Sequence, residues 1–210
     1  DFSASLNPDG PPGWVLTAME EGLARARYYP DVRSRAALAG LASHLQLPEE
    51  CLLPTAGGIE AAAIAARLPG RHVIAQPTFQ EYGRLCGGHA DAPRAALMDC
   101  AFPPGGALWV CNPNNPTADA LPREAMAALL ARAEAAGGPL IVDEAFIDYC
   151  PGRSVRDWVA AHPALIVLGS LTKVLAIPGA RLGYLAAHPS AIGALAGRLP
   201  PWRLNCVADA

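Results

Sequence analysis

Hydrophobic residues follow two spacings along this chain, one typical of helices and one typical of buried strands. Apolar residues at helical spacing and alanine-rich stretches predict helices over residues 14–27, 34–45, 58–67 and 122–136. Short unbroken apolar runs predict buried strands at His72–Gln76, Ala107–Cys111, Pro139–Val142 and Leu165–Gly169. Because strands alternate with helices, we expect an α/β fold, with a mostly parallel sheet and helices on both of its faces.

Proline and glycine mark loops between these elements, at residues 8–13, 103–106 and 112–116. No internal repeat or low-complexity linker divides the chain, so we expect one continuous core preceded by an irregular arm. We place the arm and the first helix in residues 1–30 and a large domain in residues 31–210. Parallel sheets bind ligands just beyond the carboxyl ends of their strands. The residues that follow each predicted strand are therefore the place to look for a site.

The composition of the 210 residues is that of a protein with a large buried core. Hydrophobic residues make up 52% of the chain and charged residues 17%. The net charge of -3 argues against nucleic acid or an anionic membrane surface as the main partner. No apolar run approaches the ~20 residues that a membrane-spanning helix needs. We expect a small-molecule ligand, with no nucleic acid and no membrane as partner.

The 6 cysteines and 5 histidines are scattered rather than grouped at the spacing of metal ligands. Several cysteines lie in apolar surroundings, as Cys111 does directly after Trp109 and Val110. Such cysteines are typical of reduced, buried thiols in the cytosol. The sequence therefore predicts a cytoplasmic protein without a metal site.

Glycines precede the third predicted helix, in the segment 55–60 (Thr-Ala-Gly-Gly-Ile-Glu). The exposed N–H groups of such a helix start can approach an anion closely, and the helix dipole favours a phosphate there. The strand His72–Gln76 is followed by the segment 77–82 (Pro-Thr-Phe-Gln-Glu-Tyr), whose aromatic side chains could cover a bound ring. Alone, each feature is also typical of an ordinary turn or of core packing.

Amide and carboxylate groups follow the next two strands. After Ala107–Cys111 comes the segment 112–117 (Asn-Pro-Asn-Asn-Pro-Thr), whose Asn-Pro steps force extended backbone and present amides at the strand end. After Pro139–Val142 comes Asp143, at the start of Asp-Glu-Ala-Phe. A carboxylate at the end of a buried strand must be paired to stay ionised, and a protonated pyridine nitrogen is a suitable partner.

The last predicted strand leads directly to a lysine. Ser170, Leu171 and Thr172 precede Lys173, and Arg181 follows it by eight residues. Apolar neighbours lower the pKa of a lysine amine by desolvation, which makes Lys173 a candidate Schiff-base nucleophile. Ser170 and Arg181 are candidate phosphate ligands, because a guanidinium can bind a phosphate through two hydrogen bonds.

Together these groups point to pyridoxal 5′-phosphate (PLP) as the cofactor. A PLP site needs a lysine for the Schiff base, a carboxylate for the pyridinium, a donor for the phenolate and a cup for the phosphate. This chain supplies all four at successive strand ends. We therefore predict a PLP-dependent enzyme.

In this order, the motifs resemble those of the fold-type I PLP-dependent enzymes, and the resemblance covers essentially the whole chain. It implies that Lys173 carries the cofactor and shuttles protons, and that Asp143 holds the pyridinium. It also implies that Asn115 donates to the phenolic oxygen and that Tyr82 stacks on the ring. The groups implied around the phosphate are the backbone amides of Gly58 and Ile59 and the side chains of Ser170, Thr172 and Arg181.

The same resemblance implies a homodimer with shared sites. In this family a tyrosine before a proline, here Tyr29 before Pro30, reaches the cofactor phosphate of the partner subunit. The family also continues into a smaller C-terminal domain that carries the arginine for the substrate carboxylate. We expect that domain to be missing or truncated here, and no residue of this chain is assigned the arginine's role.

Within this fold, residues 1–8 (Asp-Phe-Ser-Ala-Ser-Leu-Asn-Pro) resemble the L-threonine-O-3-phosphate decarboxylases of cobalamin biosynthesis. Residues 201–205 (Pro-Trp-Arg-Leu-Asn) do so too, and so does Phe146, because the related histidinol-phosphate aminotransferases usually have tyrosine there. The resemblance implies decarboxylation of threonine phosphate, with Asn7 as a candidate substrate contact. Two alternatives stay open: an aminotransferase such as one for histidinol phosphate, and a non-catalytic PLP-fold module for binding or dimerisation.

Overall fold

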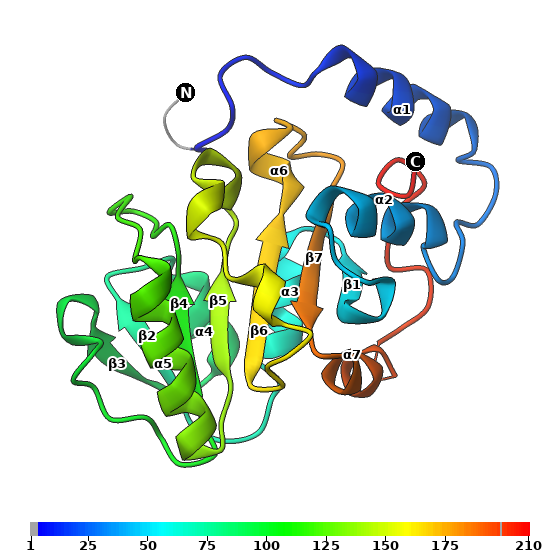
Figure 1. The fold of residues 1–210 in the computed structure, drawn as a ribbon. Helices are drawn as coiled ribbons and strands as arrows, with labels where there is room; N and C mark the ends of the chain where they lie inside the picture. The colour runs from blue at the N-terminus through cyan, green and yellow to red at the C-terminus, as the bar shows by residue number, and fades with distance from the viewer. Residues whose placement is uncertain (1–3, 198) are drawn as a thin grey trace.

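The computed structural model describes residues 4–197 and 199–210, which form a seven-stranded sheet (Figure 1). Its strands are β1 (Leu52–Thr55), β2 (His72–Gln76), β3 (His89–Pro93), β4 (Ala107–Cys111), β5 (Leu140–Asp143), β6 (Leu165–Ser170) and β7 (Gly183–Ala187). They lie in the order β1-β7-β6-β5-β4-β2-β3. The strands from β3 to β6 in this order are parallel, whereas β7 is antiparallel to both of its neighbours. The predicted α/β fold with a mostly parallel sheet is confirmed.

Helices connect most of the strands. They are α1 (Gly13–Ala24), α2 (Arg35–Leu45), α3 (Gly58–Ala65), α4 (Glu81–Cys86), α5 (Arg123–Ala136), α6 (Leu171–Val174) and α7 (Pro189–Ala196). Short 3₁₀ helices lie at Glu49–Cys51, Arg94–Ala96, Ile147–Tyr149, Pro151–Arg153 and Arg156–Trp158. Within the described residues, none of the helices has the length and apolar character that crossing a membrane takes.

The two faces of the sheet pack against different helices, because successive side chains of a strand point to opposite sides. In β4, Leu108 and Val110 join the core that contains residues of α2 and α5. Trp109 and Cys111 join the core that contains residues of α3, α4 and α7. Figure 1 shows α5 in front of the sheet and α3 and α4 behind it. Burial on both faces explains why these strands are continuous apolar runs.

The four strands predicted from apolar runs are all present, with ends that differ by at most one residue. β1, β3 and β7 were not predicted. β3 is an edge strand with mostly exposed or half-buried side chains, so it lacks the apolar run that marks a buried strand. The first helix ends at Ala24 rather than at residue 27, because the side chains of residues 23–29 are exposed and give a longer helix nothing to pack against.

The N-terminal segment crosses the carboxyl ends of the strands before it enters α1 (Figure 1). Hydrogen bonds attach this segment to the residues around Lys173. One of them runs from the Asn7 backbone N–H to the Lys173 carbonyl, at 3.0 Å. The placement of the domain boundary at residue 30 stays a prediction.

Candidate active site

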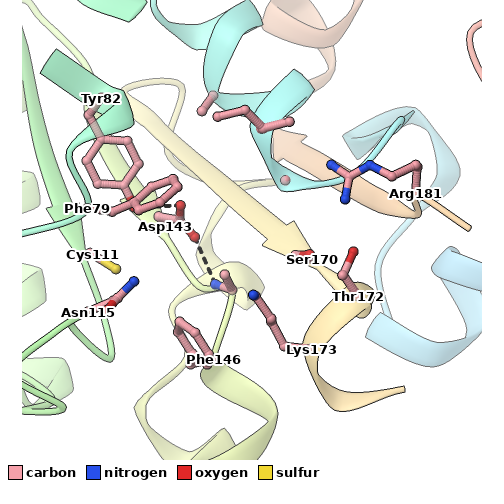
Figure 2. A pocket seen from close by; sticks show the side chains of 14 residues that line it. Phe79, Tyr82, Cys111, Asn115, Asp143, Phe146, Ser170, Thr172, Lys173 and Arg181 are labelled. Carbon is pink, nitrogen blue, oxygen red and sulfur yellow. Dashed lines mark hydrogen bonds between the residues drawn. The ribbon is translucent and has the colours of Figure 1, made fainter. Parts of the chain in front are cut away.

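A cavity of about 210 Å³ lies at the carboxyl ends of β4, β5 and β6 and the start of α3 (Figure 2). The predicted site residues among its lining are Gly58, Ile59, Tyr82, Asn115, Asp143, Ser170, Thr172, Lys173 and Arg181. The other lining residues are Ala62, Phe79, Cys111, Ala145 and Phe146. The parallel strands bring residues that are far apart in the sequence to the same edge of the sheet.

Lys173 is the only lysine in the chain. It lies in the short helix α6, directly after β6, and is half-buried. Its Nζ donates a hydrogen bond to the Ala4 carbonyl at 2.6 Å and lies 6.0 Å from the centre of the Phe146 ring. Burial, and to a smaller extent the charge of Arg181, lowers the pKa of the Lys173 amine. A lowered pKa increases the fraction of neutral amine, which is the nucleophilic form.

Asp143 is the last residue of β5 and is buried. The Tyr82 hydroxyl donates to its Oδ2 at 2.6 Å, and the Ala145 N–H donates to its Oδ1 at 2.8 Å, the second bond being drawn in Figure 2. Burial raises the pKa of Asp143, and these two hydrogen bonds oppose that effect. No ion pair among the described residues includes Asp143. A cationic group in the cavity would therefore find a buried carboxylate without a cationic partner.

The two aromatic side chains that follow β2 have different surroundings. Tyr82 is 2% exposed, and its ring packs on Trp109 with ring centres 5.3 Å apart. Phe79 is 39% exposed and meets the Tyr82 ring edge-on at 5.5 Å. Phe79 is thus the aromatic side chain of the pair that is free to cover a ring. The family resemblance implies ring stacking by Tyr82, and the structure does not favour that role because the Tyr82 side chain is buried against Trp109. The sequence places both aromatics after the same strand, and it does not tell which of them is buried.

Asn115 is the asparagine of the segment 112–117 whose side chain faces the cavity, with its amide nitrogen pointing inward (Figure 2). The amides of the other two asparagines maintain the loop. Asn112 accepts a hydrogen bond from the Leu121 N–H at 2.7 Å, and Asn114 donates to the Pro77 carbonyl at 2.9 Å. Their bonds fix the backbone on both sides of Asn115, which leaves the Asn115 amide for a ligand.

The end of the cavity near α3 is built to receive an anion. Gly57, whose φ is 81°, lies so close to Arg181 that a Cβ there would stand 2.6 Å from the guanidinium Nη2. A Cβ on Gly58 would stand 3.2 Å from the Cβ of Ser170. Helix α3 starts at Gly58, so the first N–H groups of the helix face this space without helical acceptors. The close approach of backbone, guanidinium and hydroxyl forms an anion cradle, as the phosphate of PLP requires.

Thr172 gives a direct test of whether the cradle fits such a group. Its Oγ1 is buried and has no hydrogen-bond partner among the described residues. A buried hydroxyl without a partner is costly in a protein that holds nothing in the cavity. A phosphate oxygen would accept this hydrogen bond, so the residues present fit the phosphate of PLP.

Two predicted site residues lie outside the cavity. Asn7 donates from its side chain to the Val174 carbonyl at 3.1 Å and so attaches the N-terminal segment beside Lys173. Tyr29 is 84% exposed and packs loosely on Trp202, with ring centres 5.2 Å apart. The structure therefore brings nine of the predicted site residues into one cavity and leaves Tyr29 facing outward.

A mostly parallel sheet with a lysine, a carboxylate, an amide and an anion cradle at its carboxyl ends is the arrangement of the fold-type I PLP-dependent enzymes. The sequence model of the family "aminotransferase class I and II" matches residues 91–206. The chain belongs to this family.

Known relatives include both decarboxylases and aminotransferases. The threonine-phosphate decarboxylase of Salmonella typhimurium is 34% identical over 99% of this chain and 62% of its own length. The structure of L-threonine-O-3-phosphate decarboxylase from Porphyromonas gingivalis superposes with a TM-score of 0.88, at 24% identity over 99% of this chain and 68% of the other. The histidinol-phosphate aminotransferase of Clostridium acetobutylicum has the same TM-score and identity, over 100% and 67%. The two structural matches show the fold, and the chain spans 62% of the length of the Salmonella relative.

Proposed function

We propose that this chain forms the cofactor-binding part of a PLP-dependent decarboxylase that converts L-threonine O-3-phosphate to (R)-1-amino-2-propanol phosphate. The main support for PLP as cofactor is that one cavity is lined by the only lysine of the chain, by Asp143 and Asn115, and by the anion cradle. The substrate is supported by the 34% identity to a threonine-phosphate decarboxylase over 99% of the chain. Phe146, which stands where histidinol-phosphate aminotransferases usually have tyrosine, also supports the decarboxylase.

The residues of the cavity would bind each functional group of the cofactor and cover its ring. The cradle of α3, Ser170, Thr172 and Arg181 would hold the phosphate, and Lys173 Nζ would hold the aldehyde carbon covalently. Asp143 would hold a proton on the pyridine nitrogen, and Asn115 would donate to the phenolic oxygen. In this position Phe79 would cover the ring face.

Bound PLP supplies an electron sink for the substrate carbon whose bond breaks. The protein's part is to keep that sink protonated through Asp143 and to control where a proton returns. Lys173 Nζ is the proton carrier, because its lowered pKa lets it exist as both amine and ammonium closer to neutral pH than an exposed lysine. Phe146 lies beside Nζ and adds no competing hydroxyl there.

The N-terminal segment would exclude water from the Lys173 side of the cavity. The Ala4 carbonyl accepts from Lys173 Nζ, and Asn7 is bonded to the backbone of Lys173 and Val174. Asn7 thereby positions the segment that covers the lysine. Its role as a substrate contact stays a prediction.

Product analysis tests the proposed reaction and its alternatives. The PLP-loaded protein is incubated with threonine phosphate, with and without 2-oxoglutarate, and both carbon dioxide and keto acid are measured. We expect carbon dioxide and aminopropanol phosphate without any requirement for 2-oxoglutarate. Amino transfer without carbon dioxide would contradict the decarboxylase and favour an aminotransferase such as one for histidinol phosphate. PLP binding with neither product would favour the non-catalytic module.

We also propose a homodimer in which Tyr29 reaches the cofactor phosphate of the partner subunit. The exposed aromatic side chains Tyr28, Tyr29 and Trp202 support a protein contact in this region, since such side chains are enriched at interfaces. In such a dimer each site combines Lys173 of one subunit with Tyr29 of the other.

Subunit complementation tests the shared site. Lys173→Ala and Tyr29→Phe proteins should each bind PLP poorly alone, the first because it lacks the lysine and the second by about tenfold through the lost phosphate contact. Mixed subunits should regain tight PLP binding in one site of each hybrid dimer. A chain that sediments at 21.8 kDa, or hybrids that bind no better than the Tyr29→Phe protein, would contradict the shared site.

A cytoplasmic location completes the proposal. All 6 cysteines lie among the described residues and are free thiols, which supports a reducing compartment.

A further inference from the structure

The Tyr82 hydroxyl donates a hydrogen bond to Oδ2 of Asp143 at 2.6 Å. We propose that Tyr82 is a positioning residue that keeps Asp143 ionised and aimed into the cavity, so that a proton shared with a bound pyridine ring stays on the ring nitrogen. The inference rests on the proposed function, because the ring nitrogen belongs to PLP. It gives Tyr82 a different role from ring stacking.

Both oxygens of Asp143 have a donor within the protein. Tyr82 donates to Oδ2 and the Ala145 N–H donates to Oδ1, so the plane of the carboxylate is fixed by two bonds in different directions. Each oxygen has a further lone pair for a ligand. A carboxylate that accepts hydrogen bonds is stabilised in its ionised form, which opposes the effect of burial on Asp143.

The Tyr82 side chain, which is the donor, packs against a buried group formed by Trp109 of β4 and His72 of β2. The Tyr82 ring packs on Trp109, with ring centres 5.3 Å apart. Trp109 Nε1 donates to His72 Nδ1 at 2.8 Å, and His72 Nε2 lies 3.2 Å from the Leu68 carbonyl. The His72 tautomer is thereby fixed with its proton on Nε2. These buried contacts restrain the Tyr82 ring, and with it the hydroxyl that donates to Asp143.

The groups around Asp143 determine the direction of the hydrogen bond. Burial and the neighbouring Asp143 charge raise the pKa of Tyr82 well above its ordinary value, so the phenol keeps its proton and donates. Cys111, the other ionisable neighbour of the hydroxyl, has its pKa raised to about 12, chiefly by burial, and stays a neutral thiol. Asp143 is therefore the acid of this group that ionises first.

The test compares Tyr82→Phe with Tyr184→Phe, which removes another buried tyrosine hydroxyl outside the cavity. In cofactor-free protein, the ¹³C signal of the Asp143 carboxyl is followed through a pH titration. In PLP-loaded protein, the ¹⁵N shift of labelled pyridine nitrogen reports its protonation. A hydrogen bond to a charged group predicts that Tyr82→Phe makes Asp143 at least about tenfold more basic and moves the ¹⁵N signal toward the unprotonated form. Tyr184→Phe should move neither signal.

A stronger donor should act in the opposite direction. Replacing Tyr82 by 3-fluorotyrosine keeps the ring and its packing, and should make Asp143 less basic than in the unmodified protein. This variant also keeps the test valid if Tyr82→Phe does not fold. Unchanged Asp143 titration in whichever variants fold would overturn the inference.

The two readouts separate this inference from the proposed function. The carboxyl titration needs no cofactor, so it tests the Tyr82 bond even if PLP does not bind. If PLP binds and the ¹⁵N signal is the same in Tyr82→Phe and unmodified protein, the inference fails while the proposed cofactor stands.

Discussion

The surroundings of the Asp143 carboxylate are determined by its position at the end of β5. Asp143 is the last residue of the strand, and its side chain opens into the cavity. There it accepts two hydrogen bonds and has no ion-pair partner among the described residues. Its position makes it a carboxylate suited to a protonated ring nitrogen.

Asp143→Asn should separate cofactor binding from catalysis. The amide keeps the shape and can still accept the Ala145 hydrogen bond, but it has no charge with which to hold a pyridinium. We expect PLP to stay bound through Lys173 while decarboxylation falls by about 100-fold, the effect of losing one partner of a buried ion pair. Asp209→Asn, a buried aspartate outside the cavity, is the control and should keep its rate. Comparable losses in both variants would contradict a specific role for Asp143.

Single residues differ in how far the sequence alone could predict them. Asp143 is the last residue of β5, and Asn115 and Lys173 lie in the segments that follow β4 and β6, so their places at the sheet edge could be predicted. That Tyr82 is buried while Phe79 is exposed could not be predicted, because it depends on the packing of the Tyr82 ring on Trp109. The hydrogen bonds of Asn112 with Leu121 and of Asn114 with Pro77 could not be predicted either, because no local pattern specifies these partners.

The junctions between elements create the anion cradle. β6 passes directly into α6, and this turn places Ser170 beside the first turn of α3, with Thr172 and Lys173 in the lining of the same cavity. Thr172 is left with a buried hydroxyl that no described residue satisfies. The element junction is thus adapted to a ligand at some cost to the ligand-free fold.

Thr172→Val should have opposite effects on stability and binding. Valine has the same shape without the orphan hydroxyl, so the cofactor-free protein should gain about 1 kcal/mol in urea unfolding. PLP should bind about tenfold more weakly, whereas pyridoxal without its phosphate should bind as before. Thr55→Val is the matched control, because Thr55 Oγ1 already donates to the Gly57 carbonyl and its removal should destabilise the protein. Equal losses of PLP and pyridoxal binding in Thr172→Val would contradict the phosphate contact.

The Glu144 side chain, directly after β5, forms hydrogen bonds with the segment at Ser154 and Val155. It is buried, and its two oxygens accept from the Ser154 hydroxyl and the Val155 N–H, both at 2.7 Å. Burial raises the pKa of Glu144 from 4.5 to about 7, against the effect of these hydrogen bonds. Because the folded pKa is the higher one, the folded state binds the proton more tightly than the unfolded state.

This shift predicts a stability that depends on pH. The contribution of Glu144 is fully present below about pH 4.5 and is lost as the pH rises through about 7, a difference of about 3 kcal/mol in the free energy of unfolding. Urea unfolding between pH 5 and 8 should show this decline, and Glu144→Gln should remove most of it. Asp143 and Asp209, whose pKa values burial also raises, act in both proteins and cancel in the comparison. Parallel curves for the two proteins would refute the assignment.

At the scale of the whole molecule, the site is formed by segments that lie far apart in the sequence. The apolar central strands made the parallel sheet predictable, and the rule that ligands bind beyond strand ends gave the location of the cavity. The edges were not predictable, since β7 pairs antiparallel with both β6 and β1 through contacts that no local pattern specifies. The attachment of the N-terminal segment over Lys173 also depends on contacts between residues more than 160 positions apart.

The central claim is that Lys173 holds PLP, and reduction with borohydride tests it most directly. Because Lys173 is the only lysine, reduced PLP-loaded protein should carry one phosphopyridoxyl group, and peptide mass spectrometry should place it on Lys173. The visible absorption of the bound cofactor should disappear on reduction and should be missing from Lys173→Ala. An adduct that persists in Lys173→Ala, or none in the unmodified protein, would contradict the account.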